Sequence, residues 1–268
     1  MTRSAPIDSD LLAVEERLNF FDYDRGALEE FFLKLEEPSF RARQVLQWMY
    51  HRRVTDIGAM TDLSLALRRK LKRSMSFDLP AITQEQESID GTRKWLMQLG
   101  DGNGIETVLI PDENRKTLCV SSQVGCALNC AFCATAQLGF SRNLTTAEIV
   151  GQLWLAEQTL NKDQPGSRSI TNVVMMGMGE PLLNYVAVVT AMRLMLDDLS
   201  FGLSRRRVTL STAGLVPAID RLAEDCPVSL AVSLHASDDM LRSQLVPLNR
   251  KYPISILLDA CLLYTSPS

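Results

Sequence analysis

The most informative segment of this sequence is Cys126-Ala-Leu-Asn-Cys130-Ala-Phe-Cys133. It gathers three of the chain's six cysteines into eight residues, a density at which thiolates usually hold zinc or an iron–sulfur cluster. A structural zinc site normally needs a fourth Cys or His at close spacing, and the nearest downstream histidine is His235. We therefore expect an iron–sulfur cluster with three protein ligands and one iron open to a further ligand, with zinc as the alternative.

Alternating strand and helix patterns surround this cysteine motif. Upstream, Asp101-Gly-Asn-Gly104 is a strong hairpin signal between apolar strands at 93–99 and 105–110. Downstream, strands at 117–122, 170–176, 208–210 and 228–234 are each followed by helical sequence. The first of these helices begins with a capping box, Thr145 and Glu148, and is expected to carry its apolar residues on one face. The repeats predict an α/β fold with a parallel sheet, whose chemistry lies at the C-terminal ends of the strands. Four units are too few to close a barrel.

The composition is that of an ordinary globular protein, with 46% hydrophobic residues, 22% charged residues and a net charge of −4. It excludes a disordered or wholly basic chain but allows a local basic patch. Six cysteines in 268 residues are too sparse for a secreted disulfide scaffold. The sequence also contains neither a signal peptide nor an apolar run of about 18 residues. We therefore expect a cytoplasmic protein that does not enter a membrane.

The first eighty residues differ from the rest in charge. Residues 38–79 carry nine basic and three acidic side chains, whereas residues 1–37 carry four basic and ten acidic ones. Apolar residues recur at helical spacing, and Thr61-Asp62 is the expected start of a helix that includes Leu63, Leu67 and Leu71. The basic run at 68–73 is either a solvated helix face or part of a phosphate-binding surface.

A second motif, Met176-Gly-Met-Gly-Glu-Pro181, directly follows the second strand of the parallel series. Alone it would be a turn, although its glycines let backbone groups and a carboxylate approach a ligand closely. Together with the C-x3-C-x2-C spacing and Phe132, it resembles the radical S-adenosylmethionine (SAM) superfamily. The resemblance implies two cofactors, a [4Fe-4S] cluster and SAM. The implied cluster ligands are Cys126, Cys130 and Cys133, and the implied ligands of the SAM amino group are Gly179 and Glu180.

Further stretches narrow the resemblance to one family. They are Gly104-Ile-Glu-Thr-Val-Leu-Ile-Pro111, Cys119-Val-Ser-Ser-Gln-Val-Gly-Cys126, Leu210-Ser-Thr-Ala-Gly214, Leu230-Ala-Val-Ser-Leu-His-Ala236 and the amino-terminal Phe40-Arg-Ala-Arg-Gln-Val. With the two motifs above, they resemble the bacterial dual-specificity RNA methyltransferase family (RlmN type). The resemblance implies methylation of carbon 2 of one adenosine in 23S ribosomal RNA and of one in certain transfer RNAs.

The resemblance also implies an architecture, a (β/α) TIM-type radical SAM barrel of which about four of six units are present. A small N-terminal helical domain that binds RNA is expected at 1–80 and a β-hairpin extension at 81–116. The radical SAM core, incomplete at its C-terminus, is expected at 117–268. The implied partners are the two RNAs and an external one-electron reductant of the flavodoxin type, and the enzyme is expected to be a monomer.

Members of this family carry a methyl group on a cysteine near the C-terminus, and a radical from a second SAM activates it. A covalent enzyme–RNA adduct forms, and a second cysteine resolves it while a disulfide is made. In this chain Cys119 matches the resolving cysteine and Glu106 matches the proposed proton acceptor. The implied SAM contacts are Ser211, Ser233, Leu234 and His235.

Each of these assignments has a purely structural alternative. Cys119 could be a small buried hydrophobic residue, and Glu106 could be a solvated carboxylate on a hairpin. Ser211 and Ser233 could simply end their strands, and His235 could begin a helix.

The chain departs from the family pattern after Cys261. The final Leu-Leu-Tyr-Thr-Ser-Pro-Ser268 no longer resembles the family, and no residue matches the methyl-carrying cysteine. We therefore expect a truncated or frame-shifted reading of a longer gene, one that binds a cluster but does not complete methylation. The strand near Val228 would then form an unpaired, apolar sheet edge. Two alternatives are open: a related enzyme that methylates carbon 8 of the same adenosine and confers antibiotic resistance, or a non-catalytic iron–sulfur or RNA-binding scaffold.

Overall fold

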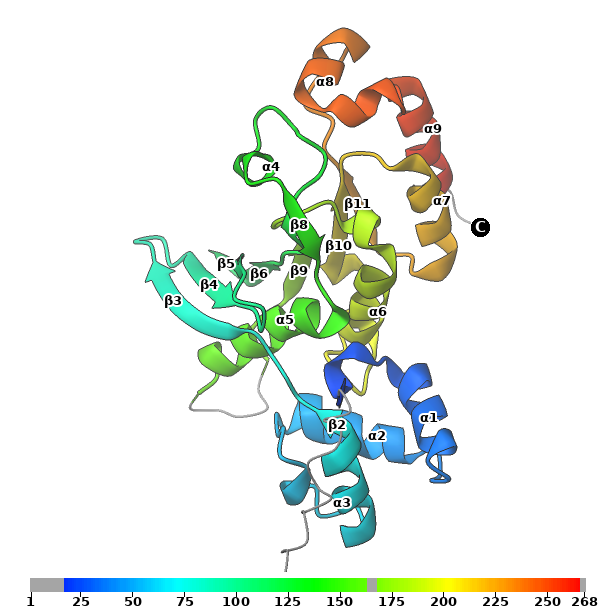
Figure 1. The fold of residues 1–268 in the computed structure, drawn as a ribbon. Coiled ribbons are helices and arrows are strands. Elements are labelled where there is room, and N and C mark those ends of the chain that lie inside the picture. The colour runs from blue at the N-terminus through cyan, green and yellow to red at the C-terminus, as the bar shows by residue number, and fades with distance from the viewer. Residues whose placement is uncertain (1–16, 163–167, 266–268) are drawn as a thin grey trace, which may run out of the picture.

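A mixed seven-stranded sheet organises the chain in this computed structural model, which describes residues 17–162 and 168–265 (Figure 1). The strand order is β11-β10-β9-β6-β5-β4-β3. Strands β6, β9, β10 and β11 are parallel, and β5, β4 and β3 continue the same sheet in antiparallel pairing. The strands are β3 (Ala81–Glu87), β4 (Arg93–Gln98), β5 (Gly104–Asp112), β6 (Arg115–Cys119), β9 (Asn172–Met175), β10 (Val208–Thr212) and β11 (Ser229–Val232).

The parallel half confirms the predicted series of four strand–helix units, and with it the partial α/β barrel. Helices α5 (Thr146–Leu160), α6 (Tyr185–Leu196) and α7 (Val216–Asp225) follow β6, β9 and β10. After β11 come α8 (Asp239–Leu245) and α9 (Ile254–Thr265). On one sheet face Leu118, Val173 and Leu210 are fully buried, whereas Cys119 and Val174 on the other face are only partly buried. Among the described residues β11 pairs with β10 alone, so it is the edge strand that the sequence predicts.

The antiparallel half contains the predicted hairpin and one strand that the sequence did not reveal. Strands β4 and β5 pair from Arg93 opposite Leu109 to Gln98 opposite Gly104, as the turn signal indicates. Trp95 and Ile105 are fully buried on one face of this pair. Strand β3 was missed because Ala-Ile-Thr-Gln-Glu-Gln-Glu87 is almost entirely polar and exposed, as suits the edge of a sheet.

Helix α5 differs from its predicted form. The capping box is confirmed, since Glu148 N–H donates to Thr145 Oγ1 and Thr145 N–H donates to the Glu148 carboxylate. The prediction of a single apolar face is wrong, because the helix is buried on nearly all sides, including at Gln152 and Glu157. The helix is enclosed because it lies between two other parts of the fold. One side packs on the sheet and the other on the N-terminal helices, where Trp154 Nε1 donates to the carbonyl of Met49 at 2.9 Å.

The N-terminal helices form the lower part of the molecule in Figure 1. They are α1 (Arg25–Lys34), α2 (Arg41–Leu46) and α3 (Leu65–Ser74), with a π-helical turn η3 (Gln47–His51) and short 3-10 turns η2 (Phe20–Asp22) and η4 (Ile57–Ala59). Two-residue strands β1 (Leu18–Asn19) and β2 (Met75–Ser76) pair beside them. The cap of α3 is Ser64, whose Oγ accepts from Leu67 N–H, and not the predicted Thr61-Asp62. Asp62 instead accepts from Trp48 Nε1 at 2.7 Å, and this hydrogen bond joins the turn η3 to the segment that precedes α3.

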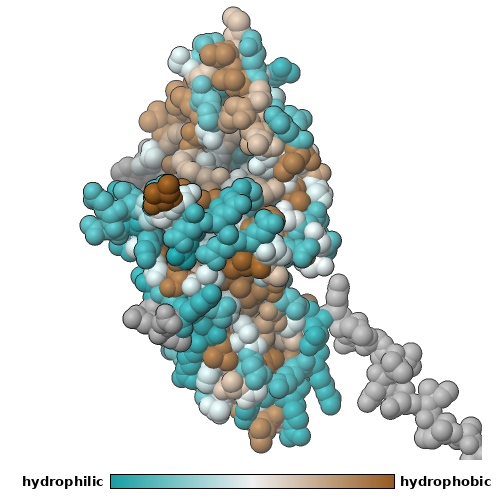
Figure 2. All heavy atoms as spheres, turned by 90° about the vertical axis from the view of Figure 1, so that its left-hand side faces the viewer, coloured by the Kyte–Doolittle hydropathy of each residue, from teal (hydrophilic) through white to brown (hydrophobic). Residues whose placement is uncertain are grey.

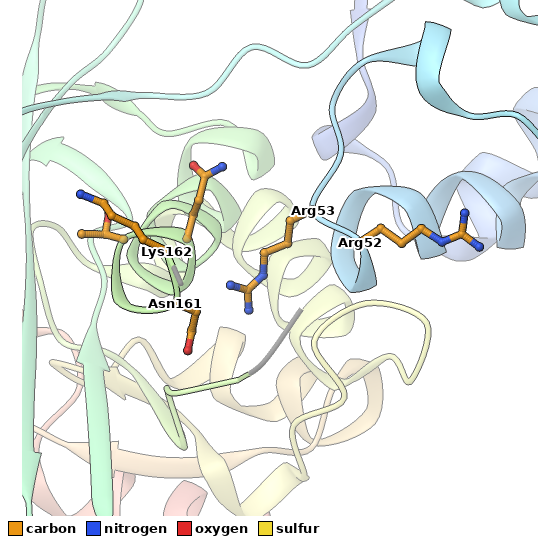
Figure 3. A pocket seen from close by; sticks show the side chains of 6 residues that line it. Arg52, Arg53, Asn161 and Lys162 are labelled. Atoms are coloured by element: carbon orange, nitrogen blue, oxygen red, sulfur yellow. The ribbon is translucent and has the colours of Figure 1, made fainter. Parts of the chain in front are cut away.

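A buried ion pair fastens these helices to α5. Arg53 donates to the Glu157 carboxylate at 3.1 Å and to the Glu157 carbonyl at 2.9 Å. The same carboxylate accepts the backbone N–H groups of Ser169 and Ile170, which lead into β9. The adjoining cavity has a volume of about 430 Å³. In Figure 3 the side chain of Arg53 is directed toward α5, and that of Arg52 is directed away from α5.

The surface in Figure 2 is divided by polarity. Hydrophilic side chains dominate the middle band, whereas apolar side chains gather in the upper half, over the part of the fold that contains α4 (Ala134–Gln137) and α8. The exposed apolar residues there include Phe132, Leu138, Phe140, Met240 and Leu241. Within residues 17–162 and 168–265 no helix is both long and apolar enough to cross a membrane.

Candidate active site

The cysteine motif lies in a loop closed by a two-stranded ribbon that the sequence did not predict. Strands β7 (Gln123–Gly125) and β8 (Phe140–Asn143) pair antiparallel, and Cys126 N–H donates to the carbonyl of Gly139 at 3.0 Å. Gly125 has a φ of 74°, and a Cβ at this position would lie 1.7 Å from the Gly139 oxygen. Only glycine therefore permits this closure immediately before the first cysteine.

Eight of the eleven predicted site residues line one cavity of about 290 Å³, formed where β9, β10 and β11 end. They are Cys126, Cys130, Cys133, Gly179, Glu180, Ser211, Ser233 and His235. This is the edge at which a parallel α/β sheet places its chemistry. Leu234, Cys119 and Glu106 lie outside the lining of this cavity.

The three cysteines have the chemistry of a cluster site. All are free thiols, and burial together with the negative charge of the neighbouring cysteines raises the pKa of Cys130 to about 11. Burial also raises the pKa of Cys126. Thiolates are the protein ligands of iron–sulfur clusters, and each can bind a different iron, so this donor set fits a [4Fe-4S] cluster.

The Gly-Met-Gly-Glu loop is held in place through Gln123. Gly179 has a φ of 95°, and a Cβ there would lie 2.5 Å from the Cβ of Gln123. Gln123 is buried, accepts from Glu180 N–H at 2.9 Å and donates to Asn143 Oδ1 at 2.8 Å. The close approach fixes the loop against the ribbon beside the cysteines. Glycine at 179 therefore serves the packing of the loop as well as access to the cavity.

Glu180 is a buried carboxylate at the back of the cavity. Its two oxygens accept from Ala213 N–H at 2.8 Å and Leu182 N–H at 3.2 Å, which ties the end of β9 to the end of β10. Burial raises the pKa of the Glu180 carboxyl above its usual range, and these hydrogen bonds offset part of the rise. A bound cation would complete the charge balance of this carboxylate, and the amino group of a ligand in the cavity is such a cation.

The remaining predicted SAM contacts come from the ends of β10 and β11. Ser211, Ser233 and His235 face the cavity, whereas Leu234 is partly exposed and contributes its carbonyl to a hydrogen bond with Arg242. His235 has a φ of 60°, and its ring contacts that of Phe132 with centroids 4.2 Å apart. The loop after β11 therefore touches the cysteine loop directly.

Glu106 and Cys119 share the less buried face of the sheet, beside the cavity. Val108 lies opposite Cys119 in the β5–β6 pair, so Glu106 is a diagonal neighbour of Cys119. Glu106 is about half exposed and forms an ion pair with Lys94 at 2.5 Å. Burial raises the pKa of the Cys119 thiol, and the backbone of Met176, a residue that lines the cavity, lowers it by a hydrogen bond.

A buried polar network links the backbone of Glu106 to the glycine loop, and sequence reasoning missed it. Ser121 Oγ donates to the Glu106 carbonyl at 2.7 Å and accepts from Met178 N–H at 2.9 Å. Gln152 accepts from Ser121 N–H at 2.7 Å and donates to the Ser121 carbonyl at 2.9 Å. The signal that could have revealed it is a single amide side chain within the apolar run Ile149-Val-Gly-Gln-Leu-Trp154.

The basic run on α3 is only in part an exposed surface. Arg68 is half-buried and donates to the carbonyl of Gly58 at 2.7 Å, and Lys72 pairs with Asp56 at 3.7 Å. Arg69 and Arg73 are exposed. Arg68 therefore has a role within the fold, and the phosphate-binding interpretation rests on the exposed members of the run.

Comparisons with known proteins agree with this arrangement. Residues 18–76 match the family model "Ribosomal RNA large subunit methyltransferase N-terminal domain", and residues 120–265 match the model "Radical SAM superfamily". The chain is 56% identical over 251 residues to the dual-specificity RNA methyltransferase RlmN of Marinobacter nauticus. The matching region covers 94% of this chain and 68% of that protein.

A solved structure is similar as well. The crystal structure of a radical SAM methyltransferase from Sphaerobacter thermophilus superposes with a TM-score of 0.83 at 44% identity, covering 92% of this chain and 72% of that one. The N-terminal helices, the partial barrel and the cysteine motif thus occur together in one known kind of protein, and the chain belongs to the RlmN family of radical SAM methyltransferases.

Proposed function

We propose that this chain supplies the cluster-binding, SAM-binding and resolving residues of an enzyme that methylates carbon 2 of an adenosine in 23S ribosomal RNA and in certain transfer RNAs. The reaction runs through a methyl-cysteine intermediate, and no residue of this sequence matches the methyl-carrying cysteine. The observation that carries the proposal is the single cavity shared by the three cysteines, Glu180 and the ends of three parallel strands. Family membership supports the substrate class, because the relative at 56% identity is a dual-specificity RNA methyltransferase.

Cys126, Cys130 and Cys133 would hold the [4Fe-4S] cluster, and the cavity would hold SAM beside it. When bound, these groups supply a one-electron cleavage of SAM that gives a 5′-deoxyadenosyl radical. The Glu180 carboxylate lines the cavity, which supports its role as acceptor of a hydrogen bond from the SAM amino group. Phe132 and His235 line the same cavity, with ring centroids 4.2 Å apart.

Cys119 and Glu106 are proposed to act at the RNA end of the reaction. Their diagonal positions on one sheet face support this proposal, because a thiol and a carboxylate there can approach the same base. Glu106 accepts the proton that the base loses, and its ion-pair partner is Lys94. Cys119 resolves the enzyme–RNA adduct. Burial raises the pKa of its thiol, which favours the protonated form at neutral pH.

The N-terminal helices are proposed to bind the RNA backbone through exposed cations such as Arg69 and Arg73. We further propose that the enzyme works as a monomer in the cytoplasm and receives its electron from an external flavodoxin-like donor.

The test is anaerobic reconstitution of residues 1–268 with iron and sulfide, followed by incubation with SAM and a strong reductant. We expect 5′-deoxyadenosine to be released in proportion to cluster content, and none from Cys130→Ser protein treated in the same way. A fully loaded sample that releases no 5′-deoxyadenosine would contradict radical chemistry and favour the scaffold alternative.

A second measurement identifies the RNA product. The loaded protein is incubated with SAM and a fragment of 23S ribosomal RNA, and modified adenosine is mapped by mass spectrometry. A carbon-2 product supports the proposal and overturns the expectation that this chain cannot complete methylation, whereas a carbon-8 product would assign the chain to the related resistance enzyme. Glu106→Gln should leave 5′-deoxyadenosine release unchanged, because Glu106 lies outside the cavity.

A further inference from the structure

Arg242 on α8 is a cation almost completely removed from solvent, with 1% of its surface exposed. Its guanidinium donates to four backbone or amide oxygens. Nε donates to the Leu234 carbonyl at 3.1 Å and Nη1 to Asn249 Oδ1 at 2.6 Å. Nη2 donates to the carbonyls of Ala213 at 2.8 Å and Ser233 at 3.3 Å. One side chain thus joins the loop after β10, the loop after β11 and the turn η7 (Pro247–Arg250).

The acceptors of Arg242 are all neutral. Among the described residues no carboxylate forms an ion pair with it, and the nearby Asp239 instead accepts from Asn249 Nδ2 and Ile254 N–H, both at 2.9 Å. A buried cation is costly unless hydrogen bonds and negative charge compensate it. The hydrogen bonds are present, and the nearby negative charge of Asp239 offsets part of the cost of burial without a direct ion pair.

Arg242 is close to the cavity on two sides. Ala213, whose carbonyl it binds, donates its N–H to the Glu180 carboxylate, so a single residue separates Arg242 from the base of the cavity. The cysteine loop is tied to the end of α8 by Ala131 N–H, which donates to the Leu245 carbonyl at 3.0 Å.

We propose that Arg242 is a positioning residue for the SAM cavity, which clamps the ends of β10 and β11 together. This inference rests on the proposed function, because it assumes that the cavity binds SAM. Groups behind a binding site often set the orientation of the residues that line it through hydrogen bonds.

The clamp predicts a specific requirement for arginine. It needs the planar fork of a guanidinium, which binds several carbonyls at once. Arg242→Lys keeps a cation but loses the fork, so it tests the clamp alone, whereas Arg242→Gln loses both the fork and the charge. Arg250→Gln is the matched control, since Arg250 is an exposed arginine on the adjoining turn η7.

The first readout does not need a cluster. Hydrogen exchange of the apo chain is measured over peptides that cover residues 211–216 and 231–237. We expect exchange at least about tenfold faster in Arg242→Gln and Arg242→Lys than in wild type or Arg250→Gln, with unchanged exchange in the N-terminal helices. Loss of one clamp loosens the two loops locally because their carbonyls lose a shared donor.

The second readout uses the loaded chain. We expect the dissociation constant for SAM to rise about tenfold in both Arg242 variants, the usual scale for groups that orient a metal site's ligands. Arg250→Gln should match wild type.

Each outcome decides the proposal. Folded Arg242→Gln with wild-type loop exchange and SAM affinity within twofold overturns it. If Arg242→Gln does not fold, Arg242→Lys decides: faster loop exchange with weakened SAM binding supports the clamp, and wild-type affinity overturns it. Failure of both variants to fold assigns Arg242 to the core and also overturns the proposal. Failure of the wild-type chain to load a cluster contradicts the proposed function instead, and the exchange experiment then still tests the clamp.

Discussion

The cavity edge of the sheet and the exposed face of α3 differ in how their polar side chains are fixed. At the cavity, Glu180, Gln123 and Gln152 are buried, and backbone groups bind each of them at a defined distance. On α3, Arg69 and Arg73 are exposed cations on long side chains. The first region depends on geometry, so a single changed atom should matter. The second depends on summed charge, so its effects should be graded and sensitive to salt.

The largest effect is expected from Cys130→Ser at the cavity. Removal of one of three thiolates should lower iron content after reconstitution and reduce SAM cleavage by at least about 100-fold. Cys226→Ala is the matched control, because Cys226 is buried but lies outside the cavity. Iron, sulfide and 5′-deoxyadenosine are measured on the same samples. Wild-type iron content in Cys130→Ser would remove Cys130 from the ligand set.

Gly125→Ala tests how strictly the loop beside the cavity depends on backbone geometry. The added Cβ would overlap the Gly139 oxygen at a positive φ, so we expect a loss of about 3 kcal/mol in the free energy of unfolding. Gly102 has a similar φ of 87° but open space around it, so Gly102→Ala should cost about 1 kcal/mol. Urea unfolding measures both. Equal losses would show that backbone conformation, and not the close approach, sets the requirement for glycine.

Gln152→Leu should have a somewhat smaller effect. It keeps the side-chain volume but leaves the N–H and carbonyl of Ser121 without their amide partner, at a cost of about 2 kcal/mol. Gln158→Leu, on an exposed position of the same helix, should change stability by less than about 0.5 kcal/mol. Urea unfolding of the two variants should separate them. A Gln152 variant as stable as the Gln158 variant would contradict the role of this network.

The smallest effect is expected on α3. The double variant Arg69→Glu/Arg73→Glu should weaken RNA binding and reduce the slope of log affinity against log salt by about 2. Arg115→Glu/Lys116→Glu reverses two exposed charges at the start of β6 and should leave the slope nearly unchanged. Fluorescence anisotropy of labelled RNA at several salt concentrations measures this. An unchanged slope in the first variant would make α3 a solvated face.

The sequence predicted the features that depend on neighbouring residues. The cysteine spacing, the Thr145–Glu148 capping box and the Asp101–Gly104 turn each act within a few residues, so their patterns could be read directly. The alternation of strands and helices gave the parallel sheet, because each unit repeats one local pattern. The edge at which Ser211 and Ser233 meet then followed from the strand order.

The features that escaped prediction depend on distant partners. Arg242 binds Ala213 from 29 residues away, and Gln152 binds Ser121 from 31 residues away, so neither has a local signature. Burial of α5 on both sides required knowledge that the N-terminal helices pack there. Strand β3 is polar along its length, and only its pairing with β4 identifies it.

The position of α5 between two surfaces has a mechanical consequence. Asp22 binds Ala147 N–H near one end of the helix, and Arg53 binds Glu157 near the other, while Gln152 grips the sheet from between them. Both attachments and the contact with the sheet are thus made along one helix. Because a helix of this length is a stiff rod, Asp22, Arg53 and Ser121 are held at fixed separations from one another.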